Sequence, residues 1–410
     1  MDIFGILSMI GGLALFLYGM EAMGAGLSKL SGGRMERLLE KLTSKRIMAV
    51  LLGAGVTAVI QSSSATTVMV VGFVNSGIMK LNQAVGIIMG ANIGTTITSW
   101  LLSLTGIQGS SFILKMLKPS SFSPILAIVG IIFIMFTKDE KKKDIGGIFL
   151  GFAILMYGME AMSGAVAPLA DNEKFTGILT MFSNPILGLL AGTILTAVIQ
   201  SSSASVGILQ ALCATGAVNF STALPIIMGQ NIGTCVTAII SSIGTSKNAK
   251  RAAAVHLFFN ISGTVIFMVV FYTLNTFVHF SFLNTAASPA GIAVIHSLFN
   301  IGATILLFPF ANLLEKMAIL AIPDKGSEVE EMEEEKINPD LARLDERFLD
   351  KPGFAMEECR GVAINMARKS KKAMNLAIDL LKEYDEKTSA RVEKLENQID
   401  QYEDALGTYL

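Results

Sequence analysis

The stretch TAVIQSSSA occupies residues 57–65, and the same nine letters return at residues 196–204. Each copy places a glutamine and three serines inside an apolar run, where unpaired polar side chains are costly to bury. A single cluster of this kind is most simply explained by polar residues that let helices pack closely. Two identical clusters in matching surroundings instead indicate a duplicated functional feature.

The duplication extends beyond these nine residues at a constant offset of 139 positions. Residues 53–98 align without gaps to residues 192–237, and 21 of the 46 positions are identical. The sequence YGMEAM at residues 18–23 returns at residues 157–162 with the same offset. Shared Gln, Asn, Thr and Glu in register indicate an internal repeat rather than two unrelated apolar segments.

Composition divides the chain into a membrane domain and a soluble tail. Of the 410 residues, 52% are hydrophobic and 16% are charged, whereas soluble globular chains carry about 25% charged residues. Residues 1–320 consist mostly of apolar blocks, and residues 322–410 contain a dense mixture of charged side chains. We therefore expect an all-α membrane protein with a soluble helical tail.

Cysteine usage and the N-terminus add two smaller expectations. Cys213, Cys235 and Cys359 are odd in number and widely spaced, so they predict no disulfide framework. Apolar sequence starts at Ile3 with no basic residue before it. We therefore expect the first span to be retained rather than cleaved as a signal peptide.

Two segments differ from the ordinary membrane spans predicted by hydropathy. The ordinary spans are residues 3–27, 83–104, 121–137, 146–166, 222–243, 252–274 and 290–320. Residues 49–75 and 186–212, which contain the QSSS clusters, each consist of two short apolar pieces around a polar centre. Because a spanning helix needs about 20 apolar residues, each segment is predicted to be a re-entrant helical hairpin, with irregular backbone surrounded by protein.

The distribution of basic residues supports this topology. Lys and Arg are concentrated in loops 28–48, 137–144 and 244–251, and they are scarce in loops 167–185 and 275–289. With two re-entrant hairpins and the N-terminus outside, all three basic loops lie in the cytoplasm, as the positive-inside rule requires. The two halves then form an inverted-topology repeat, an arrangement typical of secondary transporters.

These observations predict four parts of the chain in a multi-pass protein of the cell membrane, with a cytoplasmic tail. Residues 1–137 form repeat 1, and residues 138–321 form repeat 2 with additional helices. Residues 322–353 form an acidic linker, and residues 354–410 form the helical tail.

The tail is predicted to contain two amphipathic helices, at about 354–384 and 388–410, because apolar residues recur there at helical spacing. Two helices leave an apolar face without a partner. We therefore expect either that the tail continues in a longer chain or that it pairs with a second copy as a homodimer. No ligand is assigned to the tail, since a run of charges usually marks a solvated surface.

The QSSS clusters suit an anion and a hard cation together. Each predicted hairpin tip begins a second half-helix, whose free N–H groups and dipole favour an anion. Serine hydroxyls can donate to anion oxygens or offer lone pairs to a cation, and the NIGT segments at 92–95 and 231–234 add amide and hydroxyl groups. No Lys or Arg lies in these segments, so neutral oxygens that suit sodium predict cation-coupled uptake of an anion.

Two other pairs of polar residues are candidates with open roles. Glu21 and Glu160 are functional candidates because carboxylates inside membrane helices usually serve function, although snorkelling to a nearby span end is sufficient to explain them. His256 and His296 each precede an asparagine by four residues. A hydrogen-bonded network of His and Asn between helices is favoured there over a proton relay.

The paired QSSS clusters, the two G-x-N-I-G-T segments and the inverted halves make residues 1–320 resemble the type II sodium/phosphate cotransporter family. The tail makes the chain similar to bacterial members with a PhoU-like cytoplasmic domain. The resemblance implies sodium-driven uptake of inorganic phosphate by alternating access. It implies substrate contacts at Gln61, Ser62, Ser63, Ser64, Gln200, Ser201, Ser202, Ser203, Asn92 and Asn231. It implies sodium ligands at Ser64, Thr66, Thr95, Ser203 and Thr234.

Several alternatives stay open at this point. Electrogenic animal relatives carry an extra aspartate near the ion sites, and residues 53–98 and 192–237 contain none, so the charge stoichiometry is not determined. Another oxyanion, proton coupling, or a phosphate sensor acting through the tail would use the same residues. A serine hydrolase is disfavoured because G-x-S-x-G is absent around the serines. The expected partners are phosphate, sodium as coupling ion and the lipid bilayer, with no enzymatic activity, no other cofactor and no nucleic acid.

Overall fold

The computed structural model of the protein describes residues 3–31, 45–107, 116, 118–170, 172–323, 340–349 and 352–410. Regular structure within these residues is helical, apart from one isolated β-bridge between Asn219 and Ala286. The predicted all-α fold is therefore confirmed. Most of the basic loop at 28–48 and of the acidic segment at 322–353 lies outside the described residues.

Seven helical segments of the described chain are long and apolar enough to cross a membrane, and they fall on the seven predicted spans. Five are continuous: α1 (Ile3–Ser31), α5 (Leu81–Ser103), α7 (Pro119–Phe136), α8 (Glu140–Val166) and α14 (Lys247–Val278). Two are interrupted: α12 (Phe220–Gly233) is followed by α13 (Cys235–Ser241), and α15 (Pro289–Leu307) by α16 (Ala311–Ala321). Short 3-10 helices are η1 (Leu104–Gly106), η2 (Ala167–Leu169), η3 (Ser281–Asn284) and η4 (Phe308–Phe310).

Each QSSS segment forms two short helices with a break between them. The first copy gives α3 (Arg46–Ile60) and α4 (Ser63–Asn75), and the second gives α10 (Pro185–Ile199) and α11 (Ser202–Cys213). These helices contain 12 to 15 residues, fewer than the roughly 20 that a spanning helix needs. A further helix, α9 (Glu173–Met181), lies in the predicted loop 167–185 and is bent by 97° from α10.

Helices α1 and α8, which carry the two YGMEAM copies, pack against each other in opposite directions. Gly12 lies against Met162 and Gly26 lies against Asp144, so residue numbers rise along one helix as they fall along the other. At the centre of the contact, a Cβ atom on Gly19 would overlap the backbone of Leu155. Glycine therefore permits this close approach, as is common between membrane helices.

Two further helix pairs, whose residue numbers rise in the same direction, also approach closely at glycines, at equivalent positions of the two halves. In α3 and α5, a Cβ atom on Gly90 would overlap the carbonyl oxygen of Val50. In α10 and α12, a Cβ atom on Gly229 would overlap the carbonyl oxygen of Leu189. These positions are related by the offset of 139 residues, so the duplication in sequence is also a duplication of helix packing.

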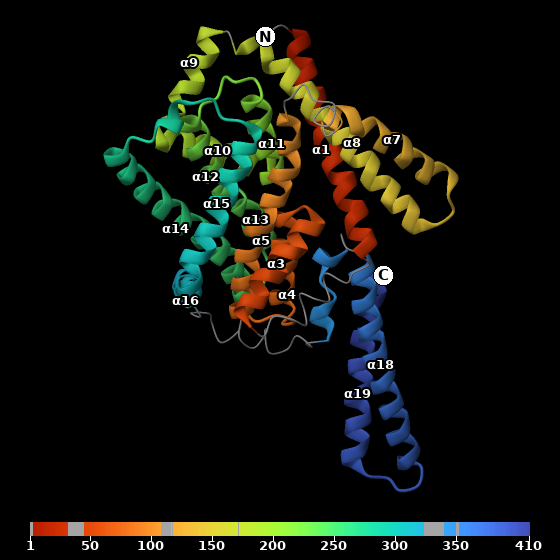
Figure 1. Ribbon diagram of the computed structural model, residues 1–410. Coiled ribbons are helices and arrows are strands. Elements are labelled where there is room, and N and C mark those ends of the chain that lie inside the picture. The colour runs from red at the N-terminus through yellow and green to blue at the C-terminus, as the bar shows by residue number, and fades with distance from the viewer. Residues whose placement is uncertain are drawn as a thin grey trace.

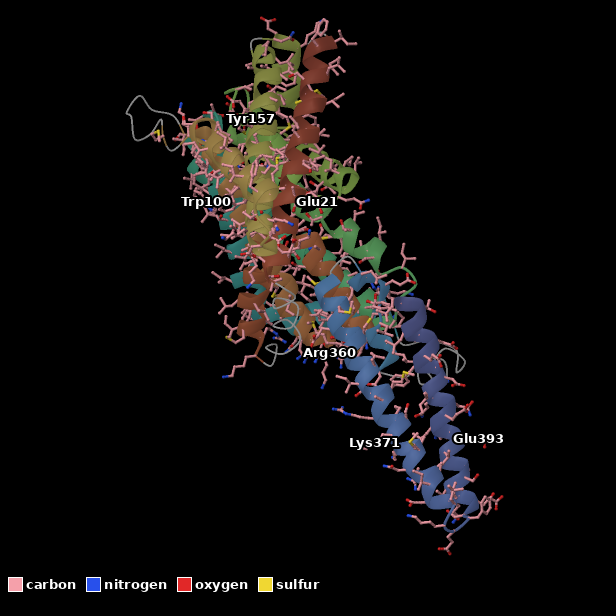
Figure 2. The ribbon with its side chains drawn as sticks, turned by 90° about the vertical axis from the view of Figure 1, so that its right-hand side faces the viewer. Glu21, Trp100, Tyr157, Arg360, Lys371 and Glu393 are labelled. Atoms are coloured by element: carbon pink, nitrogen blue, oxygen red, sulfur yellow. The ribbon has the colours of Figure 1, made fainter. Side chains whose placement is uncertain are left out.

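The tail forms a helical hairpin of α18 (Pro352–Leu380) and α19 (Glu386–Tyr409), which confirms the two predicted helices. Figure 1 shows the hairpin extending from one end of the helical domain, while α1 begins at the opposite end. Figure 2 shows Arg360, Lys371 and Glu393 on this hairpin, where all three are exposed.

The tail is anchored by residues that the sequence assigned to a linker. Residues 340–349 form η5 (Leu341–Arg343) and η6 (Glu346–Phe348). The Phe348 side chain is fully buried, and its ring centroid lies 5.2 Å from that of Phe73 on α4 and 4.9 Å from that of Phe354 on α18. This part of the segment is therefore a folded contact between the tail and the membrane domain.

Polar contacts surround this aromatic cluster. Asn75 Nδ2, at the end of α4, donates to Asp345 Oδ2 at 3.0 Å, and Asn75 Oδ1 accepts from the Ser246 N–H at 2.9 Å. Arg347 pairs with Asp345 and donates to the Ser241 carbonyl oxygen at 3.0 Å. The tail thus contacts α4, which begins at the first QSSS cluster, and the α13–α14 turn, which follows the second NIGT segment.

Candidate functional site

The break inside each QSSS segment is made by its glutamine. Gln61 has φ 60° and Gln200 has φ 58°, so both adopt the left-handed conformation that ends a helix. Their backbone N–H groups donate to Thr57 and Thr196 respectively, each at 2.7 Å. A non-glycine residue in this region costs about 1–3 kcal/mol, so the surrounding structure holds two equivalent strained tips.

The first serine of each cluster begins the second helix. Ser62 Oγ accepts from the Ala65 N–H at 3.1 Å, and Ser201 Oγ accepts from the Ala204 N–H at 3.2 Å. Both are therefore N-caps, a position for which serine is strongly preferred. Capping uses one hydroxyl lone pair and leaves the hydroxyl proton available to an acceptor.

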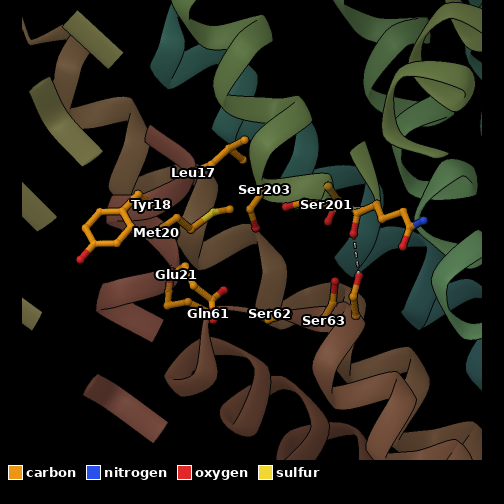
Figure 3. Close-up of a pocket in the computed structure, with 12 residues that line it drawn as sticks. Leu17, Tyr18, Met20, Glu21, Gln61, Ser62, Ser63, Ser201 and Ser203 are labelled. Atoms are coloured by element: carbon orange, nitrogen blue, oxygen red, sulfur yellow. Dashed lines mark hydrogen bonds between the residues drawn. The ribbon is translucent and has the colours of Figure 1, made fainter. Parts of the chain in front are cut away.

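The two tips meet at one cavity. Ser64 Oγ donates to the carbonyl oxygen of Gln200 at 3.5 Å, which joins the first tip to the second. A cavity of about 480 Å³ lies between them (Figure 3). It is lined by Leu17, Tyr18, Met20, Glu21, Gln61, Ser62, Ser63, Ser64, Gln200, Ser201, Ser202 and Ser203. All eight residues of the two QSSS clusters are thus brought together.

The electrostatics of this cavity come mainly from neutral groups. No Lys or Arg is among the described residues that line it, and Glu21 is the one charged side chain there. The N-termini of α4 and α11 both begin at the cavity wall, since Ser63 and Ser202 are their first residues. Two helix dipoles and six serine hydroxyls therefore favour an anion, while hydroxyl and amide oxygens can hold a cation.

Five predicted site residues do not line this cavity. Thr66, Asn92, Thr95, Asn231 and Thr234 are buried, and each side chain donates to the carbonyl oxygen four residues earlier on its own chain at 2.9 to 3.1 Å. Such bonds satisfy polar groups inside apolar helices. In this conformation the structure therefore places the Asn and Thr residues behind the tips rather than at the cavity surface.

The two halves differ in how they hold their glutamines. Gln61 is 6% exposed; its amide donates to Ala58, and its Oε1 accepts from Thr98 Oγ1 at 2.9 Å. Gln200 is exposed, and the hydrogen bonds found for it within the described part of the chain are made by its backbone, not by its side chain. The residue equivalent to Thr98 is Thr237, whose buried hydroxyl has no partner among the described residues. The second tip is thus less constrained than the first.

The same contrast continues next to the tips. Thr57 Oγ1 donates to Thr66 Oγ1 at 3.0 Å in the first half. Their equivalents, Thr196 and Ser205, are fully buried, and neither hydroxyl oxygen has a partner within the described residues. The sequence is nearly the same at these positions, so the difference comes from how the two halves are packed.

One wall of the cavity, on α1, was not predicted from the sequence. Leu17, Tyr18 and Met20 line it from α1. The repeated YGMEAM was the available signal, but it occurs on α8 as well, and no α8 residue lines the cavity. Glu160, the equivalent of Glu21, is exposed away from it.

The expected His–Asn network between helices is wrong in the form predicted. Asn260 Nδ2 donates to the carbonyl oxygen of His256 at 3.0 Å, and Asn300 Nδ2 donates to that of His296 at 2.9 Å. Each bond lies within one helix. The contacts between helices found here within the described residues both involve Cys235 on α13: its Sγ donates to the His256 carbonyl oxygen at 3.5 Å and accepts from Asn260 Nδ2 at 3.4 Å.

Comparison with known proteins identifies the family. The family model described as Na+/Pi-cotransporter matches residues 15–164 and 154–294. The chain belongs to the Na+/Pi-cotransporter family. This is a family of transporters rather than enzymes, and together with the seven spanning helices it describes a multi-pass membrane protein of a phosphate transporter family.

Three relatives show the range of similarity. "Uncharacterized protein YqeW" of Bacillus subtilis is 29% identical over 315 residues, which cover 76% of this chain and 97% of the relative. "Putative inorganic phosphate export protein YjbB" of Salmonella typhimurium is 26% identical over 323 residues, covering 78% of this chain and 56% of the relative. "Sodium-dependent phosphate transport protein 2A" of Rattus norvegicus is 39% identical over 113 residues, covering 26% and 17%.

These matches differ in length as well as in identity. The matched residues span nearly all of the Bacillus relative and about half of the YjbB protein. No solved structure matches the chain.

Proposed function

We propose that the protein is a secondary transporter that couples sodium influx to uptake of inorganic phosphate by alternating access. The observation that carries this proposal is the single cavity lined by both QSSS clusters, with Ser64 in contact with Gln200. A phosphate ion there would accept hydrogen bonds from serine hydroxyls and from the N–H groups that begin α4 and α11. Because lysine and arginine are absent from the described lining, co-bound sodium would supply the positive charge.

The proposed site keeps the residues expected from the sequence. The proposed phosphate ligands are Gln61, Ser62, Ser63, Ser64, Gln200, Ser201, Ser202 and Ser203, with support from Asn92 and Asn231. The proposed sodium ligands are Ser64, Thr66, Thr95, Ser203 and Thr234. The threonines donate their hydroxyl protons to their own helices and keep oxygen lone pairs that an ion could use.

The alternating-access part of the proposal rests on the matching packing of the two halves and on the different environments of their two glutamines. Antiparallel packing of α1 and α8, and equal packing of α3–α5 and α10–α12, support two inverted repeats at 1–137 and 138–321. The short helices on both sides of each glutamine support re-entrant hairpins. The differing environments of Gln61 and Gln200 are what a transporter in one of two related conformations would show.

Orientation and the tail complete the proposal. The basic loops place the N-terminus outside and the tail, at residues 354–410, in the cytoplasm. The tail is proposed to be PhoU-like and to pack against further helices or a second copy, since Met374 and Leu381 are 67% and 86% exposed. The name of the YjbB relative favours phosphate export as the alternative to uptake. Both directions are open to a reversible carrier, since the gradients of the transported ions decide the direction of net transport.

Uptake of radiolabelled phosphate into proteoliposomes, with and without an inward sodium gradient, tests the function. Ser63→Ala and Ser202→Ala should each lower sodium-dependent uptake at least tenfold, because each removes a hydroxyl from the cavity. Ser8→Ala, on an exposed part of α1 outside the cavity, should leave uptake unchanged.

Two results would contradict the proposal. Absence of phosphate uptake by the native chain under any cation gradient would exclude cation-coupled phosphate uptake and favour the alternatives of a sensor, an exporter or a carrier of another oxyanion. Native uptake in both serine variants would exclude the QSSS site.

A further inference from the structure

Glu21 lies in the cavity without a compensating charge. It is the one charged side chain among the twelve described residues that line the cavity, and Figure 3 shows it together with the tips of both hairpins. No ion pair or hydrogen bond joins it to any lysine or arginine within the described residues. A carboxylate in a cavity that also receives phosphate repels that anion, unless a cation lies between or beside them.

The repeat provides an internal comparison. Glu160 occupies the equivalent position in the second YGMEAM, yet it lies on α8 outside the cavity. The QSSS clusters contribute equally to the lining, whereas the carboxylate comes from the first half alone. A purely structural role shared by the two glutamates would not require this difference.

The surrounding groups are suited to a monovalent hard cation. Sodium prefers oxygen ligands, and the cavity presents the Glu21 carboxylate with the hydroxyls of Ser62, Ser63, Ser203 and their neighbours. One negative ligand with neutral oxygens matches the charge of one sodium ion. Softer metals would call for His or Cys ligands, and neither residue type is among the described residues that line the cavity.

We propose that the Glu21 carboxylate is a cation ligand in the phosphate cavity and holds one sodium ion there. This inference rests on the proposed function and adds a residue to it. A sodium ion on Glu21 neutralises the carboxylate and removes the repulsion that phosphate would otherwise meet in the cavity.

Sodium dependence of transport is the first test. Phosphate uptake into proteoliposomes is measured over a range of sodium concentrations for the native protein, Glu21→Gln, Glu21→Asp and the matched control Glu160→Gln. Glu21→Gln should raise the half-saturating sodium concentration at least tenfold, Glu21→Asp should raise it less, and Glu160→Gln should match the native protein. Native sodium activation in Glu21→Gln would overturn the inference.

Sodium binding without transport is the second test. Thermal unfolding of the purified full chain is followed in sodium chloride and in N-methylglucamine chloride, with no phosphate present. Sodium should raise the Tm of the native protein and of Glu160→Gln, and should raise that of Glu21→Gln less. An equal sodium-dependent rise in Glu21→Gln would exclude Glu21 as a ligand.

The two tests separate the two proposals. Failure of the native protein to take up phosphate would exclude the proposed function, while the unfolding experiment would still decide whether Glu21 binds sodium. An equal Tm of Glu21→Gln and native protein in N-methylglucamine chloride shows that the variant is folded.

Discussion

Gln61 and Gln200 show how a single residue builds a hairpin tip. Each combines a left-handed backbone with a polar side chain at the end of an apolar helix. The following serine then begins a new helix by capping it. The two glutamines share this backbone geometry, and they differ in the hydrogen bonds of their side chains.

This difference predicts unequal effects of one substitution at equivalent positions. Thr98→Val removes the donor to Gln61 Oε1 and should destabilise the protein by about 0.5–1.5 kcal/mol, the usual value of a hydrogen bond. Thr237→Val removes a buried hydroxyl that has no partner within the described residues, so it should be neutral or stabilising. Reversible unfolding in mixed micelles would measure both, and equal losses would contradict the structural asymmetry.

At the scale of helices, close packing is achieved by glycines that recur in both halves. Gly90 lies against Val50, and Gly229 lies against Leu189, so close that a side chain has no room. The same spacing brings α3 and α10 onto their partners and so sets the positions of the two tips. Packing and site geometry are therefore linked through these contacts.

Substitution at this contact should therefore affect both stability and activity. Gly90→Ala forces α3 and α5 apart and should cost about 1–3 kcal/mol, as overpacking does. Gly55→Ala, in α3 with open space around its position, is the matched control and should stabilise slightly because alanine favours helix. The Tm of thermal unfolding and the rate of phosphate uptake should both be lower in Gly90→Ala and not in Gly55→Ala. A native Tm in Gly90→Ala would refute the steric explanation.

At the scale of the whole molecule, the tail is joined to the transporter by a compact contact. Phe348 packs between Phe73 and Phe354, and Asp345 connects Asn75 to Arg347. This contact reaches α4, whose other end is the first QSSS tip. The tail therefore has a direct structural route to the cavity.

Removing the central ring should detach the tail. Phe348→Ala deletes a fully buried side chain and should cost the docked state about 3–5 kcal/mol. Spin labels on Lys80→Cys and Glu357→Cys, both exposed sites, should give a narrow distance distribution in the native background and a broad one in Phe348→Ala. The three native cysteines are buried and are expected to stay unlabelled. The control Leu349→Ala changes a side chain that is 47% exposed, and it should keep the narrow distance distribution. A narrow distribution in Phe348→Ala as well would show that the ring does not hold the tail in place.

The sequence by itself determined the helical fold, the spans, the duplication and the QSSS residues, because hydropathy, periodicity and internal repetition are local properties of the chain. It also located the two tail helices. It did not show that residues 340–349 dock onto α4, because one buried phenylalanine in a charged segment becomes informative only when its partner is known.

Tertiary structure alone decided which residues of two equal copies reach the cavity. Glu21 lines it and Glu160 does not, and the Gln61 side chain is hydrogen-bonded while that of Gln200 is exposed, although the sequences around them match. It also placed Asn92, Thr95, Asn231 and Thr234 behind the tips, bonded to their own helices. The physical reason is that identical segments meet different neighbours after folding, and the neighbours determine burial, hydrogen bonding and access to the cavity.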